Sequence, residues 1–203
     1  MSLRLGETKI KGVNLPSYDF IKAFFDAGGK CAYSTATSFD GIISFTATSD
    51  VTDMHWMFRG CLSLTTIPLF DTSKVTSMNG MFNGSSSLTS IPLFDTSKVT
   101  SMDFMFDGCS SLTSIPSFDV SKVTRMYYTL RDCSSLETIH MINIGTDLDI
   151  SSSTKFTREA LLEIIGNLKT VTSTTRLTMG ATNLAKLTDE EKAIATNKGW
   201  SLA

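Results

Sequence analysis

Hydrophobic residues recur through the middle of the chain at a fixed spacing of 24 residues, without gaps. Four successive units share columns of Val, Met, Leu and Ile: Val51, Val75, Val99 and Val123; Met54, Met78, Met102 and Met126; Leu64, Leu88, Leu112 and Leu136; Ile67, Ile91, Ile115 and Ile139. A second methionine column and a phenylalanine column lie between them. One unit alone cannot bury these positions, so the pattern predicts that the units stack into a continuous core.

Each unit is predicted to contain one short strand and one compact return. In residues 88–93, alternation predicts a strand with Ile91 and Leu93 on one face, although Pro92 between them weakens pairing. Over residues 99–106, apolar residues at i, i+3, i+6 and i+7 predict one or two helical turns that face inward.

The flanks of the repeat differ from it and predict a division into three parts. Residues 1–46 are expected to form an N-terminal cap made of a strand pair, a short helix and an imperfect first coil, and residues 47–146 the repeat array. Residues 147–203 are expected to form a C-terminal cap of helices and a strand, with one helix capped at Thr157 and another opening with a capping box from Thr188 to Glu191.

The third unit carries a recognisable string. Residues 94–112 read F-D-T-S-K-V-T-S-M-D-F-M-F-D-G-C-S-S-L, which resembles the BspA-like leucine-rich repeats. The resemblance covers about residues 43–144. It implies an α/β repeat fold, a right-handed leucine-rich-repeat solenoid of 24-residue units with N- and C-terminal caps. It also implies a family whose better-known members are bacterial cell-surface proteins that bind host or bacterial partners, and it implies no chemistry.

Composition and charge limit the classes of partner that the chain can bind. Hydrophobic residues make up 41% of the chain, charged residues 19%, and the formal net charge is −2, which provides no basic field for nucleic acid. We expect no membrane insertion, because no window approaches the roughly 18 consecutive apolar residues of a spanning helix. The first residues carry charges where a secretion signal is apolar. The resemblance implies a cell-surface or secreted protein, while virion-associated and cytoplasmic locations stay open.

Candidate catalytic groups are few, so we expect no enzyme activity and no cofactor. The chain has two histidines, His55 and His140, and lacks the common hydrolase, nucleotide and metalloprotease motifs. An acidic column, which an enzyme hypothesis would use as stacked carboxylates, is better interpreted as turn structure; it consists of Asp71, Asp95 and Asp119.

A cysteine column contains Cys61, Cys109 and Cys133. Neighbouring coils approach within disulfide range, so a bridge between Cys109 and Cys133 stays open, although we favour free, buried thiols. Metal binding is disfavoured, because ligands on one line do not make a tetrahedron.

The positions between the paired methionines vary from unit to unit and admit large aromatic residues. If they face solvent, Trp56, Phe104 and Tyr128 form a discontinuous aromatic stripe suited to a protein or glycan partner. The alternative is that the rings lie over neighbouring coils and shield the core. The predicted binding residues are His55, Trp56, Asp103, Phe104, Tyr127 and Tyr128.

The sequence thus predicts a non-enzymatic interaction or adhesion module of the BspA-like type, which binds a protein or glycan through its exposed repeat surface. The alternative is a structural or accessory component of a larger assembly, such as a phage tail or a cell-surface scaffold. Self-association stays open.

Overall fold

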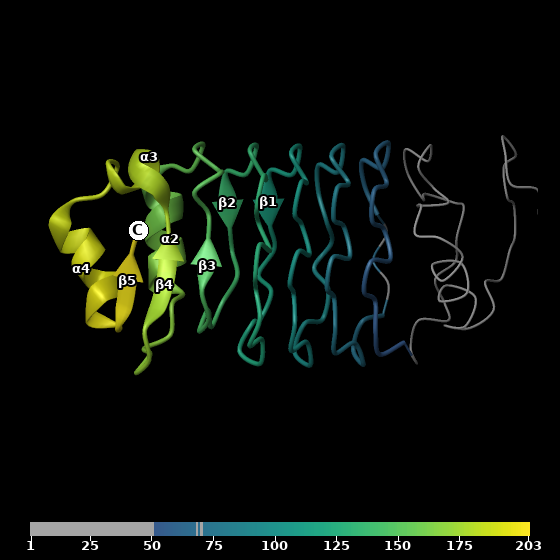
Figure 1. The fold of residues 1–203 in the computed structure, drawn as a ribbon, viewed down its shortest axis with the longest axis horizontal. Coiled ribbons are helices and arrows are strands. Elements are labelled where there is room, and N and C mark those ends of the chain that lie inside the picture. Colours follow the sequence, from purple (N-terminus) through teal and green to yellow (C-terminus); the bar gives the residue numbers. More distant parts are fainter. Residues whose placement is uncertain (1–50, 68, 70) are drawn as a thin grey trace, which may run out of the picture.

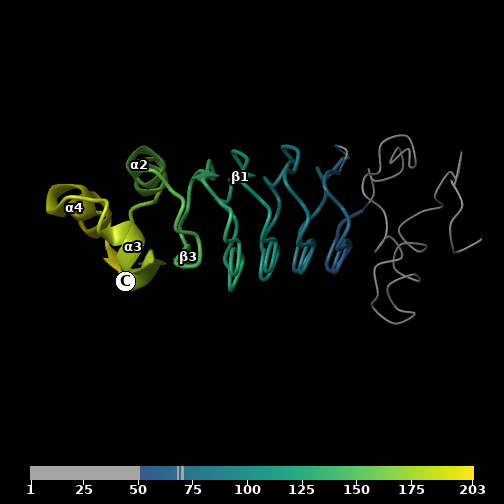
Figure 2. The same ribbon diagram turned by 90° about the horizontal axis from the view of Figure 1, so that it is seen from above.

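The computed structural model describes residues 51–67, 69 and 71–203. The predicted N-terminal cap, residues 1–46, lies outside the described residues. Within the described part, successive coils follow one another along the long axis, and the helices gather at the C-terminal end (Figures 1 and 2).

The coils are joined by hydrogen bonds that repeat every unit. Residues 24 positions apart form parallel bridges from coil to coil: Asp53 with Ser77, Ser77 with Ser101, and Ser101 with Arg125. Between the paired methionines, every second backbone N–H crosses to the next coil, as when Trp56 N–H donates to the Asn79 carbonyl at 2.8 Å. The N–H groups between them close local turns instead, as when Met57 N–H donates to the Met54 carbonyl at 3.3 Å. The backbone therefore follows the 24-residue repeat expected from the sequence.

This alternation overturns the helical turns predicted over residues 99–106. Phe104 N–H donates to Tyr127 of the next coil at 2.9 Å, whereas Met105 N–H donates to Met102 within the turn at 3.1 Å. An α-helix needs every N–H for its own i−4 carbonyl, so the segment forms successive tight turns instead. The apolar spacing was a guide to burial but not to the type of turn.

The strands of the array are shorter than the sequence predicts. Strand β1 (Ser114–Ile115) pairs in parallel with β2 (Thr138–Ile139). The prediction that Ile91 and Leu93 lie on one face is wrong, because Ile91 is buried at 8% exposure whereas Leu93 is 57% exposed. Pro92 cannot donate to a ladder, and the next residue, Phe94, is buried instead.

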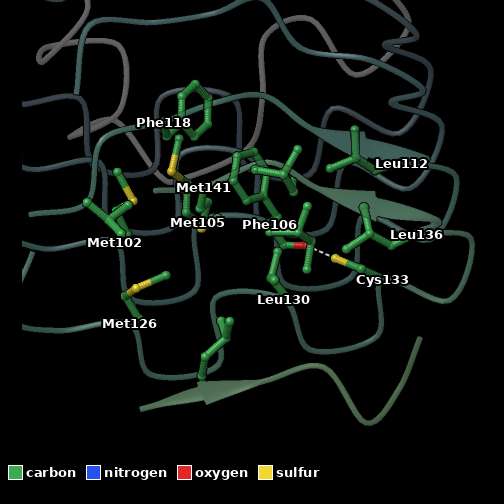
Figure 3. Packing of buried hydrophobic residues seen from close by; sticks show 14 of the residues in the cluster. Met102, Met105, Phe106, Leu112, Phe118, Met126, Leu130, Cys133, Leu136 and Met141 are labelled. Atoms are coloured by element: carbon green, nitrogen blue, oxygen red, sulfur yellow. Dashed lines mark hydrogen bonds between the residues drawn. The ribbon is translucent and has the colours of Figure 1, made fainter. Parts of the chain in front are cut away.

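The core runs through the stack as columns of identical or similar side chains. Phe58, Phe82 and Phe106 stack with their ring planes 4° apart and their centroids at 5.5 and 5.7 Å. Figure 3 shows Met102 and Met126, from neighbouring coils, among the buried side chains. The methionines of both columns are buried, as predicted: Met54, Met57, Met78, Met81, Met102, Met105 and Met126.

Hydroxyl groups add a second set of contacts between coils. Thr76 donates both its N–H, at 2.8 Å, and its hydroxyl, at 3.0 Å, to the Thr52 carbonyl. Thr100 and Thr124 repeat this pair of bonds one and two coils further on. Much of the Ser and Thr content of the chain therefore belongs to the repeat itself.

Parallel pairing continues into the C-terminal segment. Strands β3 (Leu148–Asp149), β4 (Thr175–Thr178) and β5 (Trp200–Leu202) form a parallel sheet in that order. The connections contain α2 (Arg158–Gly166), α3 (Gly180–Leu184) and α4 (Asp189–Asn197). The segment thus extends the stack, with helices in place of the compact turns.

The two helix starts predicted in this segment are confirmed. The Thr157 side chain accepts a hydrogen bond from Ala160 N–H at 3.1 Å, and Thr188 and Glu191 form a reciprocal capping box.

We predict that Phe82→Ala lowers the free energy of unfolding by about 3–5 kcal/mol, because a buried ring stacked on both sides is lost. Leu93→Ala removes a side chain that is 57% exposed, and it should change the free energy of unfolding by no more than about 0.5 kcal/mol. Urea denaturation of both variants measures the difference, and equal losses would contradict the observed core.

Candidate functional site: an aromatic face on the turn side

The aromatic positions between the methionines share one unusual backbone conformation. Trp56, Phe104 and Tyr128 have φ values of 57°, 57° and 53°, and Gly80 has 58° at the matching position of the second coil. A residue with a side chain pays about 1–2 kcal/mol for this left-handed conformation, whereas glycine does not. The column that varies in sequence is therefore constant in backbone geometry. Gly80 was the signal of this turn in the sequence.

The rings meet across the glycine. A Cβ on Gly80 would lie 2.0 Å from the Trp56 indole, so the indole occupies the space that a side chain would need. It reaches Phe104 two coils away, at 6.3 Å between ring centroids. Phe104 lies 5.7 Å from Tyr127 and 5.6 Å from Tyr128. These four residues, Trp56, Phe104, Tyr127 and Tyr128, form a contiguous aromatic face instead of the discontinuous stripe expected.

Arginines stack on the two ends of the aromatic face. The Arg59 guanidinium lies 4.9 Å from the Trp56 ring centroid, and that of Arg131 lies 4.4 Å from Tyr128. Arg131 is held by two hydrogen bonds to the Asp107 carboxylate, at 2.8 and 2.6 Å. The end rings are thus fixed by cation–π contacts.

The predicted binding residues differ in exposure. Tyr127 is 59% exposed, and the His55 imidazole is exposed while its Nδ1 lies 2.9 Å from Asp53. Trp56, Phe104 and Tyr128 are half-buried, so these rings are partly accessible and are not fully enclosed in the core.

Asp103 differs from the expectation of a solvent-facing position. It is 3% exposed, and its carboxylate accepts a hydrogen bond from Tyr127 N–H at 2.8 Å. The Arg125 guanidinium lies 2.6 Å from the other carboxylate oxygen. Asn79 makes the matching contact one coil earlier, accepting from Asp103 N–H at 3.0 Å. Asp103 thus fixes the backbone that presents Tyr127.

A pocket of about 380 Å³ opens where the aromatic face meets the C-terminal sheet. Tyr127 and Tyr128 line it together with charged residues that the sequence pattern did not predict as binding residues: Arg125, Asp147, Asp149 and Arg176. Asp147, Asp149 and Arg176 lie beyond the regular period, so no column in the sequence marked them. The pocket exists because strands β3 and β4 lie beside the last regular coil.

The acidic column has the structural role predicted for it. Asp71, Asp95 and Asp119 each accept a hydrogen bond at 2.9 Å from the backbone N–H two residues later. The Ser73 and Ser97 hydroxyls lower the pKa of Asp71 and Asp95, and the Asn143 amide lowers that of Asp119. His140 pairs with Glu163 at 2.6 Å, so it is not joined to this column.

The cysteine column supplies weak hydrogen-bond donors to the core. Cys109 and Cys133 are free and buried, and each thiol lies 3.1 Å from the carbonyl of a stacked phenylalanine in the preceding coil. Ser85 makes the same contact at 2.6 Å. Burial raises the pKa of Cys133 to about 12, which makes its thiol inert. Cys61 is disulfide-bonded, so the expectation of a free thiol is wrong there.

Among the described residues, no group of three or more His, Cys, Asp or Glu side chains could hold a metal ion. No helix in this part of the chain has the length and apolar character that crossing a membrane requires.

Comparison with known proteins shows the family to which the chain belongs. The family described as "Mycoplasma protein of unknown function, DUF285" matches residues 30–142, more than half of the chain, and the chain belongs to this family. Among solved structures, the chain is similar to the leucine-rich repeat protein of T. pallidum, with 17% identity and a TM-score of 0.45. That alignment covers 75% of this chain and 79% of the other. No curated protein shows a significant match.

We predict that Gly80→Ala lowers the free energy of unfolding by about 2–4 kcal/mol, because left-handed strain adds to a clash with the Trp56 indole. Gly60→Ala is the matched control: its φ is also positive, at 68°, but nothing lies within 4 Å of the added Cβ. It should cost about 1–2 kcal/mol. In a Trp56→Gly background, the cost of Gly80→Ala should fall to that of the control. Equal costs in the wild-type background would contradict the contact.

The acidic column predicts a pH dependence. Its folded pKa values lie below the ordinary aspartate value of about 3.9, so its stabilisation is present above that pH and is lost as the pH falls through the folded values. The triple variant Asp71→Asn, Asp95→Asn, Asp119→Asn keeps the acceptors and removes the titration. Its melting temperature should therefore fall less than that of the wild type between about pH 4 and pH 2. Superimposable acid limbs for the two proteins would contradict this assignment.

Proposed function

We propose that this protein is a BspA-like leucine-rich-repeat interaction module that binds a protein or glycan partner through the aromatic face. The observation that carries the proposal is the use of three large rings at left-handed positions, Trp56, Phe104 and Tyr128. Glycine folds at this position without strain, as Gly80 does. Strained conformations of this kind cluster at functional sites, which supports a selected surface.

The chemistry of the aromatic face also suits recognition. Trp, Tyr and Arg are the residue types most enriched at the energetic centres of interfaces. Here Tyr127 is 59% exposed, and Arg59 and Arg131 stack on the ends of the ring series. The rings are fixed by their neighbours, so binding orders few side chains and loses little entropy.

The family resemblance supports a role at the cell surface. BspA-like surface proteins bind host or bacterial partners, and we propose adhesion of the same kind for this chain. Its low net charge of −2 implies recognition by shape, rings and hydroxyl groups rather than by long-range attraction.

A binding screen against glycans and extracellular-matrix proteins, with the intact protein, tests this proposal. For any ligand found, the triple variant Trp56→Gly, Phe104→Gly, Tyr128→Gly should bind at least about tenfold more weakly, the equivalent of about 1.4 kcal/mol. Glycine suits the backbone there, so the loss of ring contacts is partly offset by relief of strain, and the variant should remain folded.

The double variant Leu69→Ala, Leu93→Ala is the control, because it removes exposed apolar side chains that lie outside the aromatic face. Its affinity should match the wild type. Unchanged binding by the folded triple-glycine variant would refute the role of the aromatic face.

A further inference from the structure

We propose that the pocket beside Tyr127 and Tyr128 binds a single neutral sugar unit, so that the ligand of the aromatic face is a glycan. This inference rests on the proposed function, because it names the ligand class at one end of the same surface. The size of the pocket, its charges and its exposed ring each favour this ligand.

The size fits a small ligand unit. The pocket has about 380 Å³, near the lower end of the range of about 300–1,000 Å³ typical of ligand sites. It lies between the last regular coil and strands β3 and β4, so a unit bound there can belong to a longer chain that continues along the aromatic face. Larger occupants would extend beyond it.

The charges favour a neutral ligand with many hydroxyl groups. Three carboxylates and two guanidinium groups line the pocket, from Asp103, Asp147, Asp149, Arg125 and Arg176. An anion would face more carboxylates than guanidinium groups, and a cation would face both arginines. Sugar hydroxyls donate to carboxylates and accept from guanidinium groups, so they satisfy both signs.

Four of these five charged side chains already have partners. Arg125 forms a 2.6 Å ion pair with the buried Asp103, and the Asp149 carboxylate accepts hydrogen bonds from the Ser151 N–H at 2.9 Å and from its hydroxyl at 2.7 Å. The Asp147 carboxylate accepts a hydrogen bond from the backbone N–H of Arg176 at 2.7 Å, and among the described residues the Arg176 guanidinium has no ion pair. Arg176 is therefore the group with the most donors to offer a ligand.

The exposed ring supplies the apolar contact that a sugar needs. Tyr127 is 59% exposed and lies 3.8 Å from Tyr128 between ring centroids, so its orientation is restricted. The C–H groups of a pyranose carry partial positive charge and pack on the negative face of an aromatic ring. Ring stacking and a polar rim together distinguish a sugar from a purely apolar or purely charged ligand.

Saturation-transfer NMR on the full chain tests the proposal with a defined panel: the methyl glycosides of glucose, galactose and mannose, N-acetylglucosamine, glucuronate and phosphoserine. At least one neutral sugar should bind, and more tightly than glucuronate or phosphoserine. Arg176→Ala and Tyr127→Ala should each weaken that binding at least about tenfold, since hydrogen bonds to charged groups contribute strongly. A panel without any neutral binder, or one led by the anions, overturns the proposal.

Lys122→Ala is the control, because it removes an exposed positive charge that belongs neither to the pocket lining nor to the aromatic face, and it should leave sugar binding unchanged. An equal loss in this variant would also overturn the proposal. Arg176→Lys, which keeps the charge but not the planar fork, should bind more weakly than the wild type and guards against a folding defect in the alanine variant.

The variant Trp56→Gly separates this inference from the proposed function, because Trp56 does not line the pocket. If it weakens partner binding while Arg176→Ala leaves sugar binding intact, the aromatic face binds a partner and the pocket proposal fails. If Arg176→Ala weakens sugar binding but aromatic-face substitutions do not affect the partner, the pocket is a sugar site and the proposed function fails.

Discussion

The structure depends on the alternation of backbone hydrogen bonds between the paired methionines. Every second N–H crosses to the next coil, and the others close turns within the coil. This arrangement forces a left-handed residue at fixed places in each coil, one occupied by Trp56, Gly80, Phe104 and Tyr128 and another by Gly60, Gly84, Gly108 and Asp132. The aromatic face follows from that backbone, because its rings at Trp56, Phe104 and Tyr128 occupy the first of these places.

The same arrangement explains why a chain rich in Ser and Thr folds into a dense core. Each threonine hydroxyl of this set donates to the same carbonyl of the preceding coil that accepts the threonine's own N–H. The Ser85 hydroxyl and the free thiols of Cys109 and Cys133 donate to the carbonyls of the stacked phenylalanines. Among the described residues, every buried side-chain nitrogen or oxygen has a hydrogen-bond partner. A buried polar group without a hydrogen-bond partner lowers the free energy of unfolding. These hydrogen bonds therefore allow polar side chains to occupy columns inside the stack.

The sequence predicted the features that depend on periodic burial and local capping. The 24-residue columns, the buried methionines and the caps at Thr157 and Thr188 could be derived because each depends on spacing along the chain. The tight turns in place of helical turns, and the exposed Leu93, depend on which partner each N–H selects, which spacing alone does not determine. Asp103 and Arg176 depend on three-dimensional neighbours, the first through Arg125 and Tyr127 and the second through β3.

Gly80 allows the aromatic face to be longer than a single coil. Each coil contributes one residue to the left-handed column, and a glycine in one coil lets a large ring from the previous coil reach the ring beyond it. All four units share the buried Val, first Met, Leu and Ile columns, so the duplication, loss or exchange of whole units would rearrange the order of rings and gaps with little repacking of the interior. Recombination between repeats would therefore change the pattern of rings on this face while the chain keeps one fold.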